Sequence, residues 1–73
     1  MSKEMSFFIY MIERYAEYKH CSSDEVLKNW DRLNLTPFIY DMYELYHIEA
    51  IENAFEDIDR LVEERQKETY NLV

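Results

Sequence analysis

Hydrophobic residues recur along this chain at the three- and four-residue spacing that is typical of amphipathic helices. Over residues 3–19, one apolar stripe contains Met5, Phe8, Ile9, Ile12, Tyr15 and Ala16. A second, weaker apolar stripe lies nearly opposite and contains Phe7, Met11 and Tyr18, with Tyr10 nearby. The pattern predicts a first helix over 3–19 whose two apolar sides indicate a central place in a bundle or an interface with a partner.

Polar start signals predict where the next two helices begin. Ser22 is followed three residues later by a glutamate, and this capping box satisfies two backbone donors, so we expect a helix over 23–33. Thr36 and Pro37 then supply a cap and a first-turn proline, which predict a third helix over 37–46. The apolar phase shifts around Tyr46 and His47, where we expect a bend or a short break.

A last helix is predicted over residues 48–65. Its apolar residues form a heptad-like seam made of Ile48, Ile51, Phe55, Ile58 and Val62. We expect the final stretch, residues 66–73, to fray, as chain ends commonly do. The predicted fold is therefore all-α and a single domain over residues 1–73. It is a compact bundle of four helices, at about 3–19, 23–33, 37–46 and 48–65.

The composition supports a helical fold. Glycine is absent and proline occurs once, so the tight hairpin turns that need a positive φ are hard to make. Twelve aromatic residues supply large burial per residue, although a chain of 73 residues buries only about 60% of its unfolded surface. The core of so small a domain is marginal unless another interaction supplements it.

Acidic residues follow the seam of the last helix. The segment 41–64 holds nine carboxylates and one basic residue, Arg60, so it carries the whole formal net charge of −8. Five of these acids come one residue after the apolar seam positions and form an acidic ridge beside it, namely Glu49, Glu52, Glu56, Asp59 and Glu63. A surface of one sign repels nucleic acid and anionic lipid and attracts basic partners. We expect a docking surface for a basic protein, and the alternative is a face that only keeps the protein soluble.

The aromatic residues exceed what one small core easily holds. We expect four residues of the first helix to act as anchors for a partner, namely Phe7, Tyr10, Met11 and Tyr18. Tyrosine is enriched at binding hot spots because it gives contact area at low entropy cost and keeps a polar tip. The alternative is a core that uses all of these residues, with the tyrosine hydroxyls at its rim.

Catalysis, cofactor binding and metal binding have little support in the sequence. It contains no glycine-rich phosphate loop and no nucleophile elbow, and His20 and Cys21 are adjacent, so they do not face each other on a helix. Glu44 and His47 form one E-x-x-H unit, whereas di-iron bundles use two such units and a structural zinc ion needs about four ligands. We expect no enzyme activity, no cofactor and no metal site.

Three further features bear on localisation and on nucleic acid. Cys21 is the only cysteine, so an intrachain disulfide and a disulfide-stapled secreted scaffold are excluded. The apolar run over residues 7–12 has no basic start and is far shorter than a membrane span of about 20 residues. We therefore expect a cytoplasmic protein without membrane contact. The predicted helix over 37–46 has no lysine or arginine, so direct nucleic-acid binding is not expected.

Four sequence blocks carry a resemblance to a known family over most of the chain. They are Phe7-Phe8-Ile9…Ile12-Glu13-Arg14-Tyr15-Ala16, Ser22-Ser23-Asp24-Glu25-Val26, Tyr43-Glu44-Leu45-Tyr46-His47 and Asp57-Ile58. In these blocks the chain resembles a family of short, all-helical bacterial proteins of unknown function. The resemblance implies a small helical protein that is often encoded beside an ADP-ribosyltransferase-like protein, an arrangement suggestive of a toxin and its antidote. The resemblance assigns no functional residues to this chain, because none is established for the family.

Together these observations predict a small acidic protein-binding module, antitoxin-like or regulatory, that docks on a basic partner protein through its last helix. The partner that the resemblance implies is the ADP-ribosyltransferase-like product of an adjacent gene. Two alternatives stay open. One is a phage-type inhibitor whose acids mimic the phosphates of a nucleic acid, and the other is a homodimeric structural protein.

Overall fold

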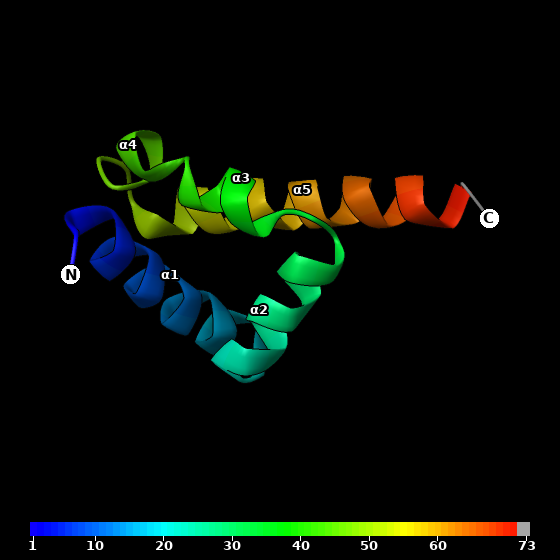
Figure 1. Cartoon of the computed structure of the whole chain (residues 1–73), viewed down its shortest axis with the longest axis horizontal. Coiled ribbons are helices and arrows are strands. Elements are labelled where there is room, and N and C mark those ends of the chain that lie inside the picture. Colours follow the sequence, from blue (N-terminus) through cyan, green and yellow to red (C-terminus); the bar gives the residue numbers. More distant parts are fainter. Residues whose placement is uncertain (72–73) are drawn as a thin grey trace.

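The computed structural model describes residues 1–71, and within them every regular element is a helix (Figure 1). The helices are α1 (Lys3–Lys19), α2 (Ser23–Arg32), α3 (Thr36–Tyr40), α4 (Tyr43–Tyr46) and α5 (Ile51–Asn71). In Figure 1, α5 runs along the length of the molecule, and α1 and α2 form a V beneath it. The all-α prediction is confirmed for this part of the chain, with five helices where four were expected. None of these five is long and apolar enough to cross a membrane.

Serine residues cap the first two helices. Ser2 Oγ accepts a hydrogen bond from the Met5 N–H at 3.1 Å, and Ser22 Oγ accepts one from the Glu25 N–H at 3.1 Å. Each cap satisfies a backbone donor that has no partner within its own helix. The predicted start of the second helix is therefore confirmed. α1 has the predicted bounds, and α2 ends one residue early because Leu33 takes the C-cap position.

The prediction of a single helix over 37–46 is wrong, because the chain bends at Asp41 and Met42. These two residues have ψ values of −9° and 10°, which separate α3 from α4. The bend allows α3 to contact α1 and α2 while α4 contacts α1 and α5. Thr36 is not the cap that we predicted, because it lies inside α3 and its hydroxyl donates to Asp31 Oδ1 at 2.5 Å.

The last helix starts later than predicted. α5 begins at Ile51 and not at residue 48, because residues 47–50 form a turn. Ile48 is 72% exposed and therefore takes no part in the predicted apolar seam. Phe55 and Ile58, which follow on the same seam, are buried in the core.

The last helix also ends later than predicted. α5 ends at Asn71, so residues 66–71 of the stretch that we expect to fray are helical, and residues 72–73 lie outside the described part of the chain. No glycine or proline interrupts this segment, and Arg65 forms an ion pair with Glu68, three residues further on. Arg65 Nη1 also donates to the Leu33 carbonyl oxygen at 2.9 Å, which ties α5 to the C-terminus of α2.

One hydrophobic core joins all five helices. Its buried residues are Phe8, Met11, Ile12, Tyr15, Ala16, Val26, Trp30, Leu33, Leu35, Ile39, Tyr46, Ala54, Phe55 and Ile58. The first predicted stripe of α1 is wrong at Met5 and Ile9, each 38% exposed, whereas Met11 of the second stripe is 1% exposed. The buried face of α1 is rotated toward Met11 because α1 contacts α4 on one side in addition to α2 and α3.

Two non-glycine residues take the left-handed conformation at helix ends, namely His20 after α1 and Asn34 after α2, each with φ of 58°. At the end of α1, the His20 N–H bonds to the Glu17 carbonyl oxygen and the Cys21 N–H bonds to that of Ala16. This arrangement satisfies carbonyl groups of the last turn. Unlike glycine, a histidine has a Cβ atom that makes the left-handed conformation sterically unfavourable, so the backbone at His20 is strained.

Glycine at position 20 is expected to relieve this strain. We predict that His20→Gly raises the free energy of unfolding by about 0.5–1 kcal/mol, because glycine takes a positive φ without a steric penalty. Urea unfolding followed by circular dichroism measures the change. The matched control, Glu13→Gly in the middle of α1, is expected to lower stability by about 1 kcal/mol. A loss of stability in both variants would contradict the prediction.

Candidate functional site

Four of the five residues of the predicted acidic ridge lie on the solvent side of α5 and in the turn before it. Glu49 is exposed in the turn, and Glu52, Glu56 and Glu63 are exposed on α5. These four residues are called the ridge glutamates below. Each residue of a helix is rotated by about 100° from the one before it, so Glu52, Glu56 and Glu63 fall on one face of α5. Within residues 1–69, no ion pair joins a ridge glutamate to a lysine or an arginine. Their negative charge is therefore not neutralised locally.

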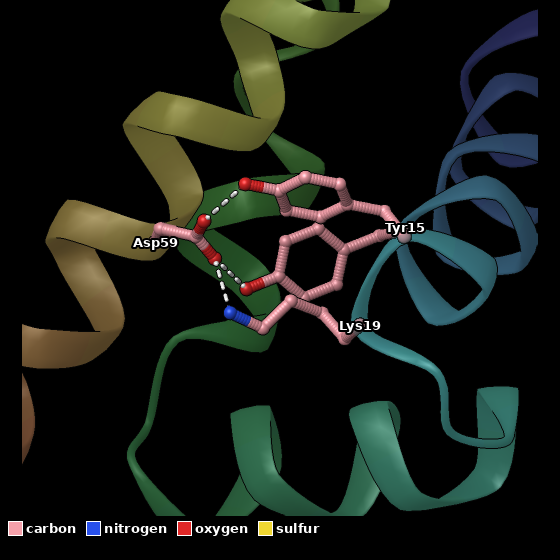
Figure 2. A network of polar contacts seen from close by, with 4 residues as sticks. Tyr15, Lys19 and Asp59 are labelled. Atoms are coloured by element: carbon pink, nitrogen blue, oxygen red, sulfur yellow. Dashed lines mark hydrogen bonds and ion pairs between the residues drawn. The ribbon is translucent and has the colours of Figure 1, made fainter.

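Asp59, the remaining residue of the acidic ridge, points toward α1, where it accepts two hydrogen bonds and forms one ion pair (Figure 2). The Tyr15 hydroxyl donates to Asp59 Oδ1 at 2.5 Å, and the Tyr18 hydroxyl donates to Oδ2 at 3.0 Å. Lys19 Nζ lies 3.1 Å from Oδ1 and completes the ion pair. These four residues are called the Asp59 network below. The Asp59 carboxylate is thus neutralised by α1 and differs from the ridge glutamates in that respect.

The protonation states of the Asp59 network follow from these contacts. Burial raises the pKa of the Asp59 carboxyl group, but the hydrogen bonds from Tyr15, Lys19 and Tyr18 outweigh burial and bring the pKa below its ordinary value of 3.8. Burial, followed by the hydrogen bond to Asp59, raises the pKa of the Tyr15 hydroxyl well above its ordinary value of 10.0. At neutral pH Asp59 is therefore ionised and Tyr15 is protonated.

A second tyrosine–aspartate pair connects α4 to α5. The Tyr46 hydroxyl donates to Asp57 Oδ2, and Arg60 forms an ion pair with the same carboxylate. Burial, followed by the hydrogen bond to Asp57, raises the pKa of the Tyr46 hydroxyl. Together with the Asp59 network and the contact of Arg65 with α2, this pair attaches α5 to α1, α2 and α4 by polar contacts.

Three of the predicted aromatic anchors lie away from the acidic ridge or inside the core. Met11 is wrong as a surface anchor, because it is 1% exposed and packs in the core. Phe7 is half-buried, and its ring contacts Tyr43 edge-on, with centroids 5.7 Å apart. Tyr10 is half-exposed, and the Arg14 guanidinium carbon lies 5.7 Å from its ring centroid.

Tyr18 is the predicted anchor that the fold brings to the acidic ridge. Its ring stacks on Phe55 of α5, with centroids 5.0 Å apart, and the residue is 47% exposed. The hydrogen bond to Asp59 is the largest cause of the raised pKa of its hydroxyl, and the charge of Glu56 acts in the same direction. The partly exposed Tyr18 ring therefore packs on α5 at Phe55, the residue before Glu56, and its hydroxyl is influenced by the charge of that ridge glutamate.

Tyr15 and Lys19 were not predicted as partners of Asp59. Tyr15, Tyr18 and Lys19 are spaced three and four residues apart, so they project from one side of α1. This Tyr-x-x-Tyr-Lys pattern was a detectable signal for three donors converging on one acceptor. Which carboxylate they meet depends on the packing of α1 against α5, which the spacing does not specify.

His47, the histidine of the E-x-x-H unit, bonds to its own helix. Its Nδ1 lies 2.7 Å from the Tyr43 carbonyl oxygen, and because a carbonyl oxygen only accepts, Nδ1 carries the proton. The imidazole also stacks on the Tyr43 ring, with centroids 4.3 Å apart. Within residues 1–71, no three His, Cys, Asp or Glu side chains converge closely enough to hold a metal ion.

A comparison with known protein families gives a match over most of the chain. The profile of a family described as "Protein of unknown function (DUF3791)" matches residues 6–65, a range that includes the Asp59 network and the ridge glutamates. No curated protein and no solved structure matches the chain.

Removal of the Tyr15 hydroxyl tests the structural part of this site. We expect Tyr15→Phe to lower the free energy of unfolding by about 1.5–3 kcal/mol, because a partly buried carboxylate loses a hydrogen bond. The matched control, Tyr18→Phe, removes an exposed hydroxyl from the same carboxylate and is expected to lower the free energy of unfolding less than Tyr15→Phe does, because solvent water can replace the lost hydrogen bond. Urea unfolding measures both changes, and equal losses would contradict the assignment.

The lowered pKa of Asp59 predicts a specific loss of stability in acid. Because the pKa is lower in the folded state, the stabilisation is present above the ordinary value of 3.8 and is lost as the pH falls through the folded-state value. We therefore expect the melting temperature to fall more steeply between about pH 5 and pH 2 in the wild type than in Asp59→Asn. If the melting temperatures of the two proteins fell in parallel over this pH range, ionised Asp59 would not be a source of the stability that is lost in acid.

Proposed function

The chain belongs to this family of proteins of unknown function, and we propose that it is a small protein-binding module that docks on a basic partner through the acidic ridge. The role that fits such a module is antitoxin-like or regulatory. Binding would cover the exposed side of α5 and the adjoining ring of Tyr18.

The observation that carries the proposal is the charge of the ridge glutamates. Lys19 and Arg60, two cations that contact the acidic segment, pair with Asp59 and Asp57 instead. Like charges four residues apart on a helix, such as Glu52 and Glu56, destabilise an isolated helix by about 0.2–0.5 kcal/mol per pair. A basic surface placed against the ridge glutamates would remove this repulsion, and it would also raise the rate of association.

The position of Tyr18 also supports the proposal, because it supplies an ordered aromatic anchor. Charge complementarity alone gives steering and specificity more than affinity, and interfaces draw most of their affinity from a few aromatic or arginine anchors. Tyr18 is held in place by Phe55 below its ring and by Asp59 at its hydroxyl, so little side-chain entropy would be lost when a partner covers it.

The candidate partner follows from the resemblance of the chain to short bacterial proteins. These are often encoded beside an ADP-ribosyltransferase-like protein, so the product of the adjacent gene is the first partner to test. Co-expression of the two proteins followed by size exclusion at low salt would detect a complex. Separate elution would remove this partner and leave other basic proteins to be tested.

Neutralisation of two ridge glutamates tests the proposed surface. We expect the variant Glu52→Gln/Glu56→Gln to bind its partner about tenfold more weakly than the wild type, because two partly desolvated ion pairs are lost. Calorimetry at low and high salt measures the affinity. The wild type is expected to lose more affinity than the variant on addition of salt, because salt screens the ion pairs that the variant lacks.

The matched control changes the net charge equally at exposed glutamates outside the acidic ridge. Glu44→Gln/Glu64→Gln is expected to bind within about twofold of the wild type, because Glu44 lies on α4 and Glu64 lies on another side of α5. Equal weakening in both double variants would mean that only net charge matters, and the proposed docking surface would then be wrong.

A further inference from the structure

A cleft of about 390 Å³ opens between α2 and α5, next to the Asp59 network. Its walls carry polar groups that the Asp59 network does not use, namely Glu25 and Asn29 of α2 and Glu63 and Gln66 of α5. Apolar side chains of the same two helices line it as well, among them Val26 and Val62. Its volume is at the lower end of the range for ligand pockets, about 300–1,000 Å³, so one large side chain is a fitting occupant.

The charges that line the cleft favour a cation. Lys19 also lines the cleft, but it is paired with Asp59, and its Nζ lies near the rings of Tyr15 and Tyr18. The charges of Lys19 and Asp59 cancel each other, so the net charge of the cleft comes from the carboxylates of Glu25 and Glu63. Glu63 has no ion pair within residues 1–69, and Glu25 is contacted by the Ser22 hydroxyl at 3.2 Å, a neutral donor.

The arrangement of these carboxylates selects among cations. Glu25 and Glu63 come from opposite helices, and no three acidic, histidine or cysteine side chains of residues 1–71 converge as a metal ion requires. A guanidinium group is planar and directs five N–H donors outward in different directions, so it can bond to carboxylates on two walls at once. The side-chain amide oxygen of Gln66 can accept a further hydrogen bond from the same guanidinium group. The methylene groups of an arginine would lie against the apolar lining near Val26 and Val62.

We propose that this cleft receives an arginine side chain of the basic partner. The inference rests on the proposed function, since it names the chemistry by which the partner is anchored beside the acidic ridge. Glu63 belongs to both the acidic ridge and the cleft, so the two surfaces are continuous at this residue. Arginine is enriched at interface hot spots, and a guanidinium held between two carboxylates in a partly desolvated cleft is a charge-assisted contact of that kind.

A titration of the full chain with N-acetyl-arginine-N-methylamide, followed by two-dimensional NMR, tests the cleft directly. We expect saturable shifts of the backbone amides of Glu25, Asn29, Val62 and Glu63. The citrulline counterpart has the same shape without the charge, and the lysine counterpart has the charge without the planar group. Both are expected to bind at least tenfold more weakly than the arginine compound. Equal binding of either counterpart would overturn the assignment of a guanidinium site.

Variants of the chain provide the second arm of this experiment. Glu25→Gln/Glu63→Gln is expected to weaken binding of the arginine compound at least tenfold, and glutamine at position 25 retains the capping of α2. The control Glu64→Gln, outside the cleft, is expected to bind as the wild type does. Undiminished binding by Glu25→Gln/Glu63→Gln would overturn the proposal.

The two proposals fail in distinguishable ways, because Glu52 and Glu56 lie outside the cleft and Glu25 lies outside the acidic ridge. If the partner requires Glu52 and Glu56 but the arginine compound causes no shifts in the cleft, the arginine site is wrong and the docking surface stands. If the arginine compound binds in the cleft but the partner binds Glu52→Gln/Glu56→Gln normally, the docking surface is wrong and the cleft stands.

Discussion

The place of α5 in this molecule depends on the carboxylate of Asp59, which accepts hydrogen bonds from Tyr15, Tyr18 and Lys19 of α1. Large aromatic rings fill the space between the two helices, and Tyr15 meets Phe55 edge-on at 5.6 Å. A partly buried carboxylate is costly unless hydrogen bonds satisfy it, and here three donors from one helix face do so. The same contacts fix which side of α5 faces solvent.

This arrangement divides the acids of α5 into two groups. Asp57 and Asp59 point toward α4 and α1 and take part in folding, whereas Glu52, Glu56 and Glu63 stay exposed and free of ion pairs within residues 1–69. A chain of 73 residues has a small core, so polar attachments of its longest helix are a useful supplement to hydrophobic burial. The glutamates that folding does not use are the ones available to a partner.

The helices and most core positions could be predicted from the sequence, because helix caps and apolar spacing are local signals. The bend at Asp41 could not, since it depends on α3 and α4 contacting different neighbours. The acidic ridge was predictable as a set of positions, but the role of Asp59 was not, because only the packing of α1 against α5 identifies its donors. Met11 was wrongly predicted at the surface for the same reason. Both sides of α1 are apolar, and the helices that pack against α1 decide which side is buried.

A double-mutant cycle between Tyr15 and Asp59 tests the central claim most directly. The free energy of unfolding would be measured at neutral pH for the wild type, Tyr15→Phe, Asp59→Asn and the double variant. If the tyrosine–aspartate contact fixes α5 against α1, the two substitutions are coupled by more than about 1 kcal/mol. Additive effects, within about 0.5 kcal/mol, would contradict the account, because two independent sites would then hold the helices together.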